Sequence, residues 1–140
     1  MRNTPRLIDR LLRWVLTAGH RRLRRRAEPA SGNAGAHAVA LTPARAVVLV
    51  KLRYAPGWRL PGGGRDAQED VEAAALRELR EEIGMTAHGA VRVSGGLVIV
   101  EDVQYTVPRW TWEVEAVCEA PLDRLPSDLS PRVRRWLDRL

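Results

Sequence analysis

The 140-residue sequence contains a single cysteine, Cys118, and a single lysine, Lys51. One cysteine cannot form an internal disulfide, so we expect a chain that folds around a hydrophobic core in the reducing cytoplasm. The three histidines lie far apart in the sequence and do not have zinc-type spacing. No apolar run approaches the roughly 18 residues that a transmembrane helix needs. These absences exclude a disulfide scaffold, a zinc module and a membrane-spanning helix.

The composition is that of one globular domain, with 45% hydrophobic and 29% charged residues. The net charge of +6 is unevenly distributed. Residues 1–26 contain nine arginines and one acid, a net charge of +8, whereas residues 27–140 carry a net charge of −2. The positive charge therefore belongs to an N-terminal arm and is not a property of the domain that follows.

Apolar residues recur at helical spacing between the arginines of this arm, which predicts a basic amphipathic helix over residues 5–18. Arg13 interrupts the apolar run and no small-residue cleavage site follows, so we do not expect a signal peptide. Residues 27–38 contain proline, serine and two glycines, which predicts a flexible linker between the arm and a domain over residues 39–140.

Three interpretations of the arm, residues 1–26, stay open. Its apolar stripe packs on the domain, it lies on an anionic membrane surface as a peripheral contact from the cytoplasm, or it binds the phosphates of RNA. The sequence also leaves a homodimer open.

The domain alternates extended and helical patterns, which predicts a mixed α/β fold. Residues 54–64 are rich in glycine and proline and predict a loop. Asp70 is an expected N-cap and Gly84 an expected helix stop. The predicted strands span residues 39–41, 46–50, 91–93, 97–100, 104–107 and 111–117, and the predicted helices span residues 71–83 and a segment that opens at Ser130 and Pro131.

Glu78, Glu81 and Glu82 follow the i, i+3, i+4 spacing and therefore share one face of the predicted helix. Leu76, Leu79 and Ile83 form a separate stripe that can anchor the helix to a sheet. Three carboxylates on one face repel each other, and a divalent cation removes that repulsion. Ligands that offer only oxygen suit Mg²⁺ or Mn²⁺ better than zinc. A solvated acidic face is the alternative interpretation of the same three residues.

Residues 63–85 match the pattern G-x₅-E-x₇-R-E-U-x-E-E-x-G-U, where U is aliphatic, at every specified position. At average residue usage, a chance match has a probability on the order of 10⁻⁹ per window. The stretch resembles the Nudix box, and residues 58–63 (WRLPGG) resemble the approach to that box. The resemblance extends over residues 39–140, and its specific part is confined to residues 58–85.

The resemblance implies a Nudix-type α/β/α sandwich with a mixed sheet. It also implies an Mg²⁺- or Mn²⁺-dependent hydrolase that cleaves a nucleoside diphosphate linked to another group, by attack of water on phosphorus. The expected partner is thus a small nucleotide substrate. Two alternatives are a Nudix-like module that binds a nucleotide or a partner without turnover, and an RNA 5′-end pyrophosphohydrolase that uses the basic arm.

The resemblance assigns metal binding to the Gly63 carbonyl and to Glu69, Glu78, Glu81 and Glu82. Arg77 would orient the carboxylates during catalysis. Glu81 is the candidate general base within the box, and further candidates lie beyond it: Glu101, Asp102, Glu113 and Glu115.

Gly62, Gly63 and Gly64 form either a simple turn or, beside the carboxylates, a close backbone approach to a phosphate. We interpret Trp58 as a packing residue at the base of the loop. The other tryptophans singled out, Trp110, Trp112 and Trp136, are expected in the core. Pro108 and Tyr105 lie beyond the usual positions for ADP-ribose and dinucleoside-polyphosphate enzymes, so the sequence leaves the substrate class open.

The charge division predicts that the arm and the domain are separable. A chain that starts at Gly35 should fold and hydrolyse small nucleotides, while losing salt-sensitive binding to anionic vesicles or RNA because that binding rests on phosphate contacts. Thermal unfolding and binding of the full and truncated chains test this. If the truncated chain is insoluble or melts far below the full one, the apolar stripe of residues 5–18 completes the core instead.

Overall fold

A computed structural model describes residues 35–66, 68–109 and 111–140. The helix expected over residues 5–18 and most of the expected linker, together with Trp110, lie outside these ranges. The described elements are β1 (Gly35–Ala40), β2 (Ala46–Leu52), β3 (Trp58–Arg59), β4 (Gly62–Gly64), α2 (Val71–Glu82), β5 (Met85–Ala87), β6 (Val91–Ser94), β7 (Leu97–Val100), β8 (Gln104–Tyr105), β9 (Val114–Pro121) and α3 (Pro131–Leu137).

The strands form three sheets, in the orders β4-β1-β7-β6, β3-β2-β9 and β5-β8. β1 and β7 run parallel, and the other pairings are antiparallel, so the expected mixed sheet is confirmed. β4 stands at the edge of its sheet and pairs only with β1 there.

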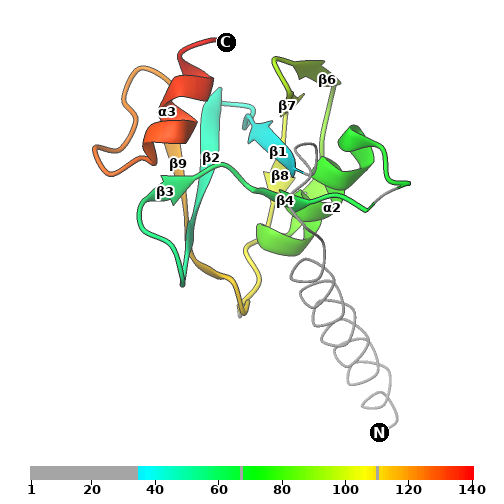
Figure 1. The fold of residues 1–140 in the computed structure, drawn as a ribbon, viewed down its shortest axis with the longest axis horizontal. Coiled ribbons are helices and arrows are strands. Elements are labelled where there is room, and N and C mark those ends of the chain that lie inside the picture. Colours follow the sequence, from blue (N-terminus) through cyan, green and yellow to red (C-terminus); the bar gives the residue numbers. More distant parts are fainter. Residues whose placement is uncertain (1–34, 67, 110) are drawn as a thin grey trace, which may run out of the picture. The chain divides into compact units, whose positions relative to one another are not determined.

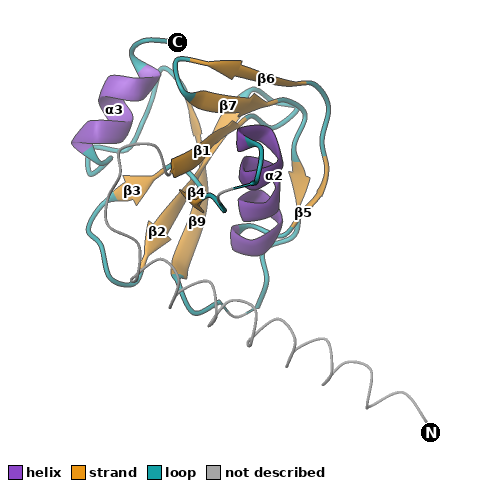
Figure 2. Ribbon diagram, turned by 45° about the vertical axis from the view of Figure 1, so that its right-hand side comes forward, coloured by secondary structure: helices purple, strands orange, loops and turns teal. Residues whose placement is uncertain are grey.

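Two helices cover opposite sides of these strands, as Figures 1 and 2 show. Side chains alternate along β1, as strand geometry requires. Ala36, Ala38 and Ala40 join the core beneath α2, whereas Val39 and Leu41 join the core beneath α3. The expected α/β/α sandwich is confirmed, because each face of the strands is buried under its own helix.

α2 begins after Asp70, which is the N-cap but makes no side-chain cap hydrogen bond, and it ends one residue before the expected Ile83. Its anchoring stripe is confirmed: Leu79 and Ile83 are fully buried, and Leu76 packs partly buried against the same core. Glu78 and Glu82 are buried beside this stripe, and Glu81 is partly exposed. The apolar spacing thus fixes which face of α2 packs against the core.

The structure differs from the sequence expectation around the glycines. Residues 54–64 were expected to be one loop, but they contain the short strands β3 and β4. β4 forms because β1 starts earlier than expected: Gly35, Ala36 and His37 pair with Gly64, Gly63 and Gly62. Residues 35–38, which the sequence placed in the linker, therefore belong to a paired strand. Glycine lacks strand propensity, so this pairing depends on a partner strand that local sequence does not reveal.

Trp58 packs against the α3-side core, as expected. Trp112 is 52% exposed, so its expected place in the core is wrong. Trp136 on α3 packs partly buried against the α3-side core.

Within the described ranges, no helix is both long and apolar enough to cross a membrane.

Substitution of Gly84 tests the expectation that this residue ends the helix. Its φ is +71°, and an added Cβ would collide with the carbonyl oxygen of Thr106. Gly95 has a similar φ of +57° but open space around it. We expect Gly95→Ala to lower the free energy of unfolding by about 1 kcal/mol through backbone strain alone. Gly84→Ala should cost at least about 2 kcal/mol, because the collision adds to the strain. Urea unfolding measures both, and equal losses would show that the close approach to Thr106 is unimportant.

Candidate active site

Two glutamates of α2 have buried side chains. Glu78 is 2% exposed and Glu82 is 5% exposed. They are buried because α2 packs on β1 and on the glycine strand β4, where the Glu82 carboxylate meets the Gly62 N–H. Buried charges need partners, and both carboxylates have them.

Arg77 is the partner that the carboxylates share. Its Nε and Nη2 atoms donate to both oxygens of Glu69, at 2.9 and 2.8 Å. Its Nη1 donates to Glu78 at 3.1 Å and lies 3.5 Å from Glu81. Nη2 also donates to the carbonyl oxygen of Gly64 at 3.1 Å. One guanidinium thus ties the segment between β4 and α2 to the acidic face of the helix.

The electrostatics of this cluster favour a permanently charged arginine. The hydrogen bonds to Glu69 raise the pKa of Arg77 above its ordinary value, and the negative charges of Glu78 and Glu81 add to this effect against the opposing effect of burial. Lysine would lack the planar fork that reaches Glu69 with two parallel hydrogen bonds while a third points at Glu78.

Gly62 of β4 contacts one of these carboxylates, that of Glu82. Its N–H donates to Glu82 Oε2 at 3.0 Å. Its φ is +154°, and an added Cβ would collide with the Ala36 carbonyl and lie 2.7 Å from the ring of His37. Only glycine fits at this position, because β1 lies too close for a side chain. Gly63 pairs with Ala36 in the strand.

The structure therefore brings together most of the expected site residues: Gly62 with Glu82, and Gly64, Glu69, Glu78 and Glu81 around Arg77. The carboxylates proposed from later strands lie among other partners. Glu101 forms an ion pair with Arg45 at 3.4 Å, and Asp102 follows it at the end of β7. Glu113 accepts a hydrogen bond from the Arg53 N–H through its backbone carbonyl.

The donor chemistry of this cluster fits a hard divalent cation, because carboxylate and backbone oxygens gather on one side of a glycine strand. In the part of the chain that the structure describes, no three His, Cys, Asp or Glu side chains already converge as a ligand set.

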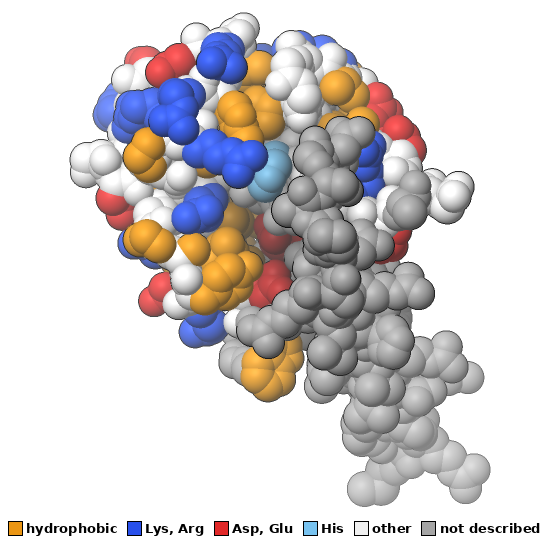
Figure 3. Space-filling view, in the orientation of Figure 1, with side chains coloured by type: hydrophobic (Ala, Val, Ile, Leu, Met, Phe, Trp, Pro, Cys, Tyr) orange, Lys and Arg blue, Asp and Glu red, His pale blue; other side chains and the backbone are white. Residues whose placement is uncertain are grey.

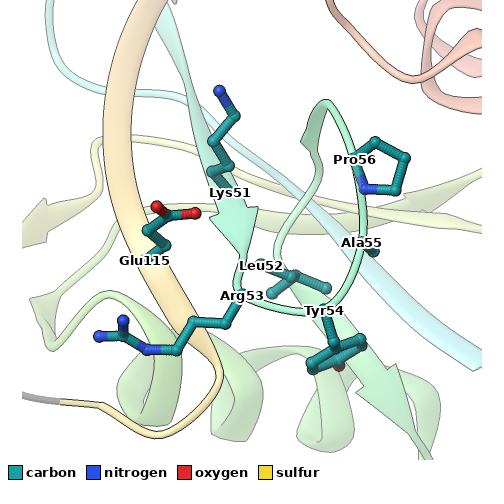
Figure 4. Close-up of a pocket in the computed structure, with 7 residues that line it drawn as sticks. All are labelled: Lys51, Leu52, Arg53, Tyr54, Ala55, Pro56 and Glu115. Atoms are coloured by element: carbon teal, nitrogen blue, oxygen red, sulfur yellow. The ribbon is translucent and has the colours of Figure 1, made fainter.

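A hollow of about 400 Å³ lies at the turn between β2 and β3. Figure 4 shows Glu115 of β9 between Lys51 and Arg53 in that view, with Tyr54 on the turn. Lys51 also forms an ion pair with Asp128 at 3.4 Å and lies over the Trp58 ring. The sequence indicated Glu115 but not the basic residues beside it, because their meeting depends on the pairing of β2 with β9.

Three features together define the class of this protein: a mixed-sheet α/β/α sandwich, buried carboxylates on α2, and a glycine edge strand beside them. The chain belongs to the NUDIX domain family, whose model matches residues 33–140. The resemblance stated from the sequence is thus confirmed.

Individual relatives match parts of the chain. A putative 8-oxo-dGTP diphosphatase of Bacillus subtilis (strain 168) is 43% identical over 53 residues, which are 38% of this chain and 36% of that protein. An RNA pyrophosphohydrolase of Acidiphilium cryptum (strain JF-5) is 67% identical over 30 residues, 21% of this chain and 18% of that protein. The matched segments therefore span about a third of the length of the first relative and less than a fifth of the second.

The fold also matches a solved structure, a MutT NUDIX hydrolase from Burkholderia pseudomallei. The TM-score is 0.60 at 24% sequence identity, and the match covers 76% of this chain and 95% of that one. This likeness supports the arrangement of the strands and helices.

Arg77 should be essential for stability, because it holds a buried carboxylate. Removing one partner of a buried pair leaves an uncompensated charge, so we expect Arg77→Met to lower the free energy of unfolding by about 3 kcal/mol at pH 7. Arg80→Met, on the exposed side of the same helix, is the control and should change it by less than about 0.5 kcal/mol.

Urea unfolding of the double variant Arg77→Met, Glu78→Gln completes the test. The loss should shrink when Glu78 no longer carries charge. Fully additive losses would mean that the pair is not the source of the effect.

Proposed function

We propose that the chain is a Mg²⁺- or Mn²⁺-dependent pyrophosphohydrolase that cleaves a nucleoside diphosphate linked to another group. The observation that carries the proposal is the burial of Glu78 and Glu82 on α2, against a glycine edge strand, within a complete motif. Burying charge is costly, so a fold that does so for stability alone would be better served by apolar residues. The diphosphatase and pyrophosphohydrolase names of partial relatives support the same reaction class.

The residues proposed to hold the cation are Glu69, Glu78, Glu81 and Glu82, with the Gly63 carbonyl as a backbone ligand. A bound divalent cation supplies neutralisation of the diphosphate charge and a lowered pKa of water. Arg77 positions the carboxylates, since its hydrogen bonds span Glu69 and Glu78.

Glu81 is the proposed general base. Its side chain is 31% exposed, against 2% for Glu78, so it combines access to water with a place in the Arg77 network. A base must reach both the attacking water and the solvent that finally takes the proton. Glu78 is too enclosed for that role.

The glycine strand is the proposed cradle for the diphosphate. β4 is an edge strand, and its three residues have no side chains, so a ligand can approach the backbone closely. Gly62, Gly63 and Gly64 would bind substrate there, beside Glu82.

A specific observation favours a second candidate, removal of pyrophosphate from RNA 5′ ends. The relative named an RNA pyrophosphohydrolase is 67% identical over its matched 30 residues, and residues 1–26 carry a net charge of +8. Such an arm would hold RNA phosphates.

We also propose a cytoplasmic location and a division into an arm, a linker and a catalytic domain.

The variant Glu82→Gln tests the metal role. Glutamine keeps an acceptor for the Gly62 N–H and removes only the charge, so the fold should persist. Turnover of a panel of pyrophosphate-containing nucleotides with Mg²⁺ should fall at least ~100-fold, because a metal ligand is lost. Calorimetric titration with Mg²⁺ or Mn²⁺ should show weakened binding.

Glu72→Gln, in the first turn of α2, is the matched control and should keep wild-type turnover. Turnover that survives Glu82→Gln, or that persists in excess EDTA, would refute the metal role. A chain that binds nucleotides but hydrolyses none would be the binding module that the sequence left open.

A further inference from the structure

A second group of polar residues touches the glycine strand from the side opposite Glu82. His37 on β1 pairs with Gly62, and its ring occupies the space where a Cβ of residue 62 would lie. His37 belongs to the alternating positions of β1 that face α3, whereas Glu82 lies on α2. A ligand lying along the edge of β4 can therefore contact residues on both faces of the sheet, the face covered by α2 and the face covered by α3.

α3 completes this group. The His37 and Trp136 rings lie 4.9 Å apart at an interplanar angle of 42°. The Arg132 guanidinium lies over Trp136 at 4.7 Å. Arg59 at the end of β3 is close enough for its charge to act on His37. We call His37, Arg59, Arg132 and Trp136 the β1–α3 basic cluster.

The cluster contains two buried nitrogen atoms that lack hydrogen-bond partners among the described residues, His37 Nδ1 and Arg59 Nε. Buried polar atoms are nearly always satisfied, by protein, water or a ligand. An arginine Nε–H can only donate, so whatever satisfies Arg59 must offer an acceptor.

The charge of the cluster comes from its two arginines. Burial, with the charges of Arg132 and Arg59, lowers the pKa of His37, so its ring is neutral at pH 7 and the two arginines supply the charge. Neither arginine has an ion pair in the described part of the chain. Figure 3 shows a histidine bordered by Lys and Arg side chains, with Asp and Glu side chains gathered below it on the same face.

These properties select an anion over a nucleobase. A base would need an aromatic face and both donors and acceptors, but the Trp136 ring already contacts His37 and Arg132. What the cluster offers is arginine donors and an imidazole nitrogen, which match the oxygens of a phosphoryl group.

We propose that the β1–α3 basic cluster binds a second phosphoryl group of the substrate, distinct from the diphosphate held beside the α2 carboxylates. This inference rests on the proposed hydrolase function and narrows its substrate to nucleotides that carry a further phosphate. That phosphate is either an internucleotide phosphodiester or a terminal phosphate on the ribose.

Three probes separate these cases in the full chain: a plain nucleoside 5′-triphosphate, the same nucleotide with a 3′-phosphate, and a 5′-triphosphorylated dinucleotide. The test variants are Arg132→Gln and the double variant Arg59→Gln, Arg132→Gln. Arg135→Gln removes the same charge from α3 and serves as control, since Arg135 is exposed and has no described contact with the cluster.

We expect KM for the probes with an additional phosphate to rise about tenfold or more, because charge-assisted hydrogen bonds are lost. KM for the plain triphosphate should stay within about twofold, as should all values for Arg135→Gln. The probe that loses more identifies the source of the phosphate. An equal rise for all three probes, or no rise for any, would overturn the proposal.

Binding in EDTA separates this inference from the hydrolase itself. Calorimetry with Glu82→Gln as background should show weaker binding of the phosphate-bearing probe when Arg132→Gln is added. If the wild-type chain hydrolyses no probe, the proposed activity fails while this measurement still decides the cluster. Arg132 is exposed on α3, so loss of binding with an unchanged melting temperature would place the phosphate contact at Arg132.

Discussion

Carboxylates that crowd together need a counter-charge, and Arg77 supplies it to Glu69, Glu78 and Glu81. Glu78 is nearly inaccessible to water, and Glu69 and Glu81 lie near it. Arg77 donates hydrogen bonds to both oxygens of Glu69, one to Glu78 and one to the Gly64 carbonyl. The same contacts tie the last residue of β4 and the segment before α2 to the helix. Stability and the proposed chemistry therefore share one side chain.

The second constraint on the site is the glycine strand β4, which packs closely against its neighbours. The Gly62 N–H donates to Glu82 on the α2 side, and the lack of a side chain at Gly62 lets β4 pair closely with β1. On the other side of the same residue, His37 fills the space that a Cβ would need. Gly62 thus separates an acidic surface from a basic one by the thickness of a backbone. This arrangement motivates both proposals, a cation on the α2 side and a second phosphate on the α3 side.

Most of the fold could be predicted because its signals are local. Apolar residues such as Leu79 and Ile83 repeat at helical spacing, and the β-branched run at residues 46–50 indicates a buried strand. The spacing of Glu78, Glu81 and Glu82 is enough to place them on one helix face, because helical periodicity alone decides it. Arg77 falls in the motif as an expected positioning residue, and the fold brings it into contact with the carboxylates. Short-range periodicity determined the helix, the strand and the shared placement of the glutamates, whereas the role of Arg77 came from the resemblance to the Nudix box and its contacts came from the fold.

Other features needed the tertiary structure, because they join segments whose contact is set by sheet pairing. The glycines have the composition of a loop and become β4 only through pairing with β1, which begins at Gly35. Trp112 was expected in the core and is exposed, since an aromatic residue in a strand-like pattern does not reveal which face is buried. His37, Arg59 and Arg132 lie up to 95 residues apart in the sequence. They form one cluster because β1, β3 and α3 pack together, and no local pattern encodes that packing.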